Sequence, residues 1–241
     1  MAVSGMEPAA AVLPAAPAAG APYDRQRGVY YPKPVLRGWL HLLWFGASLA
    51  AGTVLLSYAR GLLPVAATAI YALSVCAMFG VSALYHRGNW APARARRLQR
   101  LDHAMIFLLI GGTATPAFLL TARGSFGLAC LAVLWALILA AAAVHLAGMN
   151  RPELVVGATF VGLGLVAGLC VPGVWLHAGA AAAVLLLAGG ALYTAGALCY
   201  HRRWPNPSPA VFGYHEVFHA YVCAAATCQY IAIAVFIVNR P

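Results

Sequence analysis

Seven continuous apolar segments make up most of this 241-residue chain, and they constrain its fold more than any other feature. Each is close to the about 20 apolar residues that a helix needs to cross the hydrocarbon core of a bilayer. Backbone groups in lipid must bond internally, and the segments lack the alternation of barrel strands, so each is predicted to be a helix. The predicted spans are residues 39–58, 62–86, 101–121, 125–147, 154–171, 174–200 and 212–238.

Composition excludes a soluble or a disordered protein. Charged residues make up 8% of the chain and hydrophobic residues 63%, whereas soluble domains carry about 25% charged residues. The predicted fold class is therefore an all-α membrane protein, a multi-pass bundle of seven transmembrane helices in the cell membrane. We expect two parts: a disordered, Ala/Pro-rich cytoplasmic tail at residues 1–38 and the transmembrane domain at residues 39–241.

The basic residues predict the orientation of the bundle. Of the fifteen Lys and Arg residues, twelve lie in the tail or in the second, fourth and sixth connections, and three lie on the other side. Because positive charge is retained in the cytoplasm, we expect a cytoplasmic N-terminus and a C-terminus outside. The net charge of +10 is spread between apolar segments and so does not indicate nucleic-acid binding. A retinal protein is excluded, since the only Lys, Lys33, lies in the tail.

In this orientation, polar residues from three distant spans meet at the cytoplasmic depth of the membrane. The second span ends at Ser82 and His86, the third begins with Asp102, and the seventh begins with His215–His219 (HEVFH). Ionisable groups at membrane depth are costly and usually face a cavity or a partner. The sequence therefore predicts one polar site at this depth.

The histidines of this set have the spacing of metal ligands. His215 and His219 are four residues apart, so both imidazoles lie on one helix face. His86 is a candidate third ligand, and three protein ligands with one open position are typical of catalytic zinc sites. Zinc would lower the pKa of a bound water to about 7. The alternative interpretation is a set of interfacial histidines at the helix ends.

Two acids remain candidates for activating that water. Glu216 occupies the general-base position of the HExxH pattern, and Asp102 could accept a proton or orient a ligand imidazole. Ser82 shares a helix face with His86 and could hydrogen-bond a ligand, a metal-bound water or a substrate oxygen, although its spacing alone favours a role in helix packing. The remaining histidines, which include His41 and His201, are each interpreted as interfacial residues. The six cysteines lie in apolar segments without CxxC spacing and are expected to be free thiols.

Three motifs in chain order resemble the hemolysin III family, within the superfamily of progestin and adipoQ receptors. They are Ser82–Arg87 (SALYHR), Leu101–Pro116 (LDHAMIFLLIGGTATP) and Gly213–His219 (GYHEVFH), and the resemblance covers roughly residues 33–238. It implies a Zn²⁺ ion near the inner leaflet bound by His86, His215 and His219. It also implies that Asp102 hydrogen-bonds the zinc water with Ser82 close by, which makes Asp102 a stronger candidate than Glu216.

The superfamily is similar to alkaline ceramidases, which share this Ser, His, Asp, His pattern and cleave a lipid amide. The resemblance therefore implies a zinc-dependent hydrolase of lipid amide or ester bonds in a bacterial plasma membrane, acting on a ceramide-like or fatty-acyl lipid. Two alternatives remain open. One is a membrane-lysing, pore-forming hemolysin, although the sequence contains no amphipathic segment suited to insertion. The other is a sensor or receptor in which zinc is structural.

Overall fold

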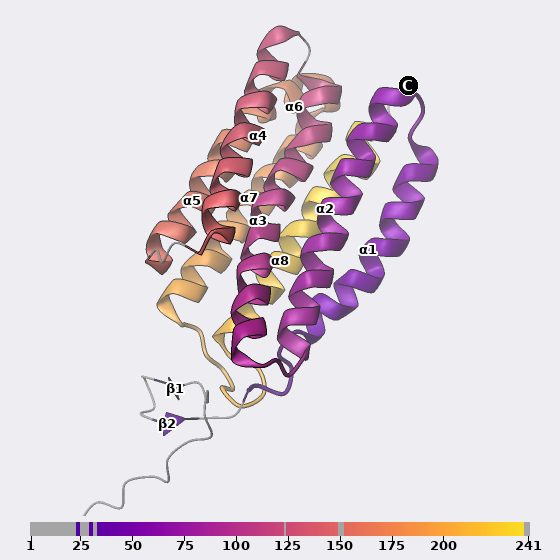
Figure 1. Ribbon diagram of the computed structural model, residues 1–241. Helices are drawn as coiled ribbons and strands as arrows, with labels where there is room; N and C mark the ends of the chain where they lie inside the picture. The colour runs from indigo at the N-terminus through magenta and orange to yellow at the C-terminus, as the bar shows by residue number, and fades with distance from the viewer. Residues whose placement is uncertain (1–22, 25–28, 31–32, 123, 149–151, 239–241) are drawn as a thin grey trace, which may run out of the picture.

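The computed structural model describes residues 23–24, 29–30, 33–122, 124–148 and 152–238, and it confirms an all-α bundle with seven helical spans. The spans stand side by side as an elongated bundle (Figure 1). Residues 1–22, 25–28 and 31–32 of the predicted tail lie outside the described residues. The elements are β1 (Tyr23–Asp24), β2 (Val29–Tyr30), α1 (Trp39–Tyr58), α2 (Leu62–Arg87), α3 (Pro92–Thr121), α4 (Ser125–Leu146), α5 (Glu153–Ala167), η1 (Gly168–Cys170), α6 (Val171–Ala178), α7 (Ala180–Arg202), α8 (Tyr214–Ile231) and η2 (Ala232–Val238).

The perimeter of the bundle is apolar, as a membrane protein requires. Large hydrophobic side chains such as Leu43, Leu73 and Phe126 are mostly exposed, whereas soluble monomers rarely expose extended apolar surface. The short antiparallel pair β1–β2 lies outside the bundle (Figure 1). The chain is therefore a multi-pass membrane protein.

The predicted break between the fifth and sixth spans, at residues 172–173, was wrong. The 3₁₀ turn η1 joins α5 directly to α6, so Leu154–Ala178 forms a single span. Pro172 lies at the start of α6, where a helix needs no backbone N–H donor and tolerates proline. The chain turns instead at Gly179, whose φ of 90° is rarely adopted by residues with a side chain.

The third span begins earlier than the predicted residue 101. α3 starts at Pro92 because its arginine-rich first turns also contain residues that favour helix formation, although they are too polar for a hydrophobic run. α3 packs against α2 and α4 and is the most enclosed span (Figure 1).

One end of the bundle, which we call the basic end, gathers the start of α1, α3 and α8 and the end of α2 and α7 (Figure 1). Its arginines include Arg87, Arg94 and Arg202. The segment before α1 is attached here, because the Val35 and Leu36 N–H groups donate to the Ala210 and Val211 carbonyls at 3.0 and 3.1 Å. This arrangement brings the predicted polar residues of three spans to one end of the bundle.

Burial and the positive charge of the basic end both act on the ammonium group of Lys33. The Lys33 ammonium donates to the Gly88 carbonyl at 3.3 Å. Partial burial, together with the guanidinium groups of Arg37 and Arg87, lowers the pKa of Lys33.

Candidate metal centre

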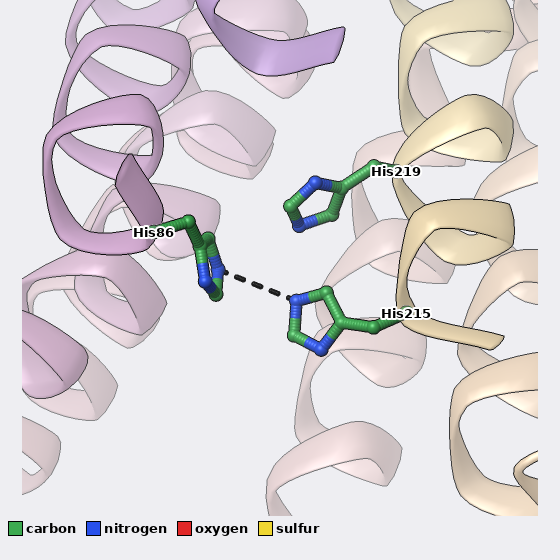
Figure 2. A group of neighbouring side chains, drawn as sticks. All are labelled: His86, His215 and His219. Carbon is green, nitrogen blue, oxygen red and sulfur yellow. Dashed lines mark hydrogen bonds between the residues drawn. The ribbon is translucent and has the colours of Figure 1, made fainter. Parts of the chain in front are cut away.

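Three imidazoles converge at the basic end from two helices. His86 lies in the last turn of α2, and His215 and His219 lie in the first two turns of α8. Figure 2 shows the ring of His86 facing the other two across the space between these helices. One candidate ligand nitrogen from each ring lies within 4.8 Å of the others. Among the described residues this is the only such group of three or more His, Cys, Asp or Glu side chains.

The spacing of two of these nitrogens matches that around a tetrahedral metal ion. The Nε2 atoms of His86 and His215 are 3.3 Å apart (dashed line in Figure 2). Two nitrogens that each lie about 2.0–2.1 Å from a tetrahedral zinc ion stand about 3.3 Å apart. The group is also shielded from solvent, since His86 and His219 are 6% and 2% exposed and His215 is half-buried. The residues therefore fit a buried metal ion with imidazole ligands.

Asp102 and Ser82 lie beside this group, as the sequence predicted for residues at this depth. The Asp102 Oδ2 atom is 3.6 Å from the His86 Nε2 atom, the same nitrogen that faces His215. The Asp102 carboxylate also interacts with the Ser82 side chain. Both side chains are buried, so α3 supplies a carboxylate and α2 a hydroxyl next to the three imidazoles.

Both carboxylate oxygens of Glu216 accept hydrogen bonds from groups other than the three imidazoles, Asp102 and Ser82. Its Oε1 atom accepts a hydrogen bond from Arg37 Nε, and its Oε2 atom accepts one from the Gly213 N–H at 2.8 Å. The second contact closes the first turn of α8, which is a common role for a Glu at the third helical position. Glu216 thus ties the helix that carries two imidazoles to the segment before α1.

The chain matches the protein family described as Haemolysin-III related over residues 29–230. The chain belongs to this family. The family is part of the superfamily of progestin and adipoQ receptors, so the resemblance seen in the three motifs is confirmed. The matched stretch includes all three converging histidines together with Asp102 and Ser82.

Two curated members of the family are similar to this chain. Hemolysin-3 from Bacillus cereus is 26% identical over 173 residues, which cover 72% of this chain and 76% of that protein. A hemolysin-3 homolog from Bacillus subtilis (strain 168) is 25% identical over 144 residues, which cover 60% of this chain and 65% of that protein.

Sequence reasoning missed two residues that the fold brings to the centre. His41 on α1 stacks on His219, with ring centroids 3.7 Å apart and an interplanar angle of 12°. Arg37, which precedes α1, pairs with Glu216. The sequence did place both on the cytoplasmic side, but it does not show that α1 packs beside α8.

Gly38 allows α1 to pack closely against the end of α2. Its φ of 79° lies in the left-handed region, and an added Cβ atom would stand 2.8 Å from the His86 Cβ atom. Glycine therefore lets the start of α1 approach the end of α2 next to a candidate ligand.

Three other histidines lie outside the three-histidine group. His103 and His145 form a separate ring pair between α3 and α4, with centroids 5.3 Å apart, and His201 is exposed on α7. All six cysteines are free, as predicted.

Replacing Glu216 by glutamine is expected to lower stability much more than metal affinity. Removing one partner of a buried ion pair costs about 3–5 kcal/mol, and Glu216 is 1% exposed. Thermal unfolding of the metal-free protein in detergent measures this loss, with the exposed Arg202→Gln as the control. An unchanged unfolding temperature would contradict the structural role of the pair.

Proposed function

We propose that this protein is a zinc-dependent hydrolase of lipid amide or ester bonds, with His86, His215 and His219 holding the ion. The observation that carries the proposal is the convergence of these imidazoles beside the buried carboxylate of Asp102. Three nitrogen ligands without a thiolate suit zinc with one position open to water or substrate. The resemblance to alkaline ceramidases supports a lipid carbonyl compound as the substrate class.

The chemistry divides between the ion and the side chains. When bound, zinc supplies Lewis-acid polarisation of a carbonyl oxygen and acidifies water. Asp102 accepts the proton of the attacking water at Oδ2 and returns it to the leaving amine or alcohol. The Ser82 hydroxyl, which hydrogen-bonds the Asp102 carboxylate, can hold that carboxylate in place for the proton transfer. Glu216 is less suited to the base role because Arg37 and the Gly213 N–H occupy its oxygens.

The surroundings of the centre favour an apolar substrate. A cavity of about 230 Å³ lies between α1, α2 and α8, and its lining includes Trp44, Ala47, Phe79 and Tyr230. The Phe79 ring contacts His41 edge-on at a centroid distance of 5.1 Å, and His41 stacks on His219. If the basic end faces the cytoplasm, as we propose, a lipid of the inner leaflet reaches this region sideways.

A hydrolysis assay tests the proposal. Purified protein is incubated with ceramide and with fatty-acyl ester lipids in mixed micelles, and released fatty acid is measured. We expect turnover that a zinc chelator abolishes and added zinc restores. Turnover that persists after chelation in a sample shown to be free of metal would reject the mechanism.

Filling the cavity is expected to slow turnover without removing metal. Ala47→Trp adds an indole to a residue of the lining, while Ala50→Trp adds one to an exposed neighbour outside the lining. We expect Ala47→Trp to reduce turnover of a long-chain lipid about tenfold, the effect of about 1.4 kcal/mol in the barrier. Zinc content should be unchanged in both variants. Equal turnover in the two variants would show that this cavity does not serve the substrate.

The names of the two Bacillus relatives favour a second candidate function, membrane lysis. Leakage of an entrapped dye from liposomes distinguishes lysis by a pore from lysis that follows lipid hydrolysis. If lysis follows from lipid hydrolysis, leakage is lost in Asp102→Asn and under chelation. Leakage that persists in both conditions indicates a pore.

A further inference from the structure

We propose that His41 is a positioning residue of the metal centre, which orients the imidazole of His219 and the hydroxyl of Ser82. The inference rests on the proposed metal site but assigns a role to a residue on a different helix from the three ligands. His41 lies in the first turn of α1, whereas the candidate ligands lie on α2 and α8.

The first contact is with a candidate ligand. The rings of His41 and His219 are nearly parallel, 12° apart, and their centroids are 3.7 Å apart. A ring held flat against another limits rotation of the second ring about its side-chain bonds. His41 is 3% exposed and His219 2% exposed, so neither has a solvent-filled space into which to turn.

The second contact is with the hydroxyl. The His41 Nδ1 atom lies 2.8 Å from the Ser82 Oγ atom, within hydrogen-bonding distance. Ser82 in turn interacts with the carboxylate of Asp102. Ser82 lies one turn of α2 before His86. The hydrogen bond with His41 therefore orients the Ser82 hydroxyl next to a candidate ligand.

Burial without a full set of partners argues against a role in packing alone. The His41 Nε2 and His219 Nδ1 atoms are buried and have no protein hydrogen-bond partner among the described residues. Burying an unpaired polar group is unfavourable, and an apolar ring would fill the space beside Phe79 without that penalty. The imidazole is thus explained by its contacts with the centre better than by packing.

Two substitutions of His41 test its contact with His219 and its contact with Ser82 separately. His41→Phe keeps a flat ring against His219 but cannot hydrogen-bond Ser82. His41→Asn keeps a polar group near the position of Nδ1 but removes the ring. Chelator competition measures the zinc affinity, and the visible spectrum of the Co²⁺-loaded protein measures the geometry of the metal site. The value of kcat measures the effect of losing the hydrogen bond to the Ser82 hydroxyl. The exposed His201→Asn is the matched control.

We expect His41→Asn to weaken zinc binding about tenfold and to change the Co²⁺ spectrum, since loss of a residue that supports a ligand costs 10–100-fold in affinity or activity. His41→Phe should keep the zinc affinity within about threefold of wild type and lower kcat about tenfold. The double variant His41→Phe with Ser82→Ala should lose less kcat than the product of the two single losses, because both changes remove the hydrogen bond between His41 and Ser82.

Wild-type affinity, spectrum and kcat in both His41 variants would overturn the inference while leaving the proposed function intact. A wild-type protein that binds no metal would overturn both. If His41→Asn does not fold, as judged by size-exclusion chromatography, His41→Phe and its combination with Ser82→Ala still decide the role of the hydrogen bond.

Discussion

Replacing His219 by alanine is expected to weaken zinc binding more than about 100-fold, because even residues that only support a metal ligand contribute 10–100-fold. His219 is one of three candidate ligands whose nitrogens lie within 4.8 Å of one another, and no fourth residue joins this group in the part of the chain that the structure describes. Zinc content after dialysis against a weak chelator measures the loss. Turnover should fall with it.

His145→Ala is the matched control for this substitution. His145 is half-buried and pairs with His103, outside the three-histidine group. Since His219→Ala leaves a buried gap beside His41, unfolding of both variants is recorded in the metal-free state. Zinc retained at the wild-type level in a folded His219→Ala variant would contradict the proposed ligand set.

Replacing Asp102 by asparagine is expected to lower kcat by about 10²–10⁴-fold, the usual contribution of a general acid–base residue. The side chain stays almost the same size but can no longer take up a proton. Its carboxylate lies 3.6 Å from the His86 Nε2 atom and is not one of the three proposed ligands. Zinc content should therefore remain at the wild-type level.

Glu216→Gln provides the comparison with the other candidate acid. We expect this variant to be less stable but to retain kcat within about tenfold, because its oxygens contact Arg37 and the Gly213 N–H. The opposite result, with kcat lost in Glu216→Gln and kept in Asp102→Asn, would assign proton transfer to Glu216. Zinc binding without turnover of any lipid in the wild type would instead favour a sensor with structural zinc.

The membrane-spanning helices were predictable from the sequence. The apolar segments had to become helices, and the bounds of α1 match the predicted residues 39–58. The boundary at 172–173 failed because a Pro-Gly pair reads as a helix breaker, while proline is tolerated in a first helical turn. α3 started earlier than predicted because hydropathy does not detect a polar helical turn outside the membrane core.

The residues of the candidate site were also predictable only in part. The pair His215 and His219 follows from helical spacing, and the helix order brings His86 to their depth. His41 and Arg37 depend on how α1 packs against α2 and α8, which a single sequence does not specify. The role of Glu216 stays open in the sequence, because the HExxH pattern and the closing of a helix by a Glu at its third position use the same residue.

X-ray absorption of the zinc-loaded wild-type protein in detergent tests the central claim most directly. We expect one ion per chain whose first shell holds nitrogen or oxygen at about 2.0–2.1 Å, with imidazole scattering from three histidines. The six free cysteines provide the alternative ligands. A sulfur shell at about 2.3 Å, or a protein that holds no zinc at all, would contradict the three-histidine centre.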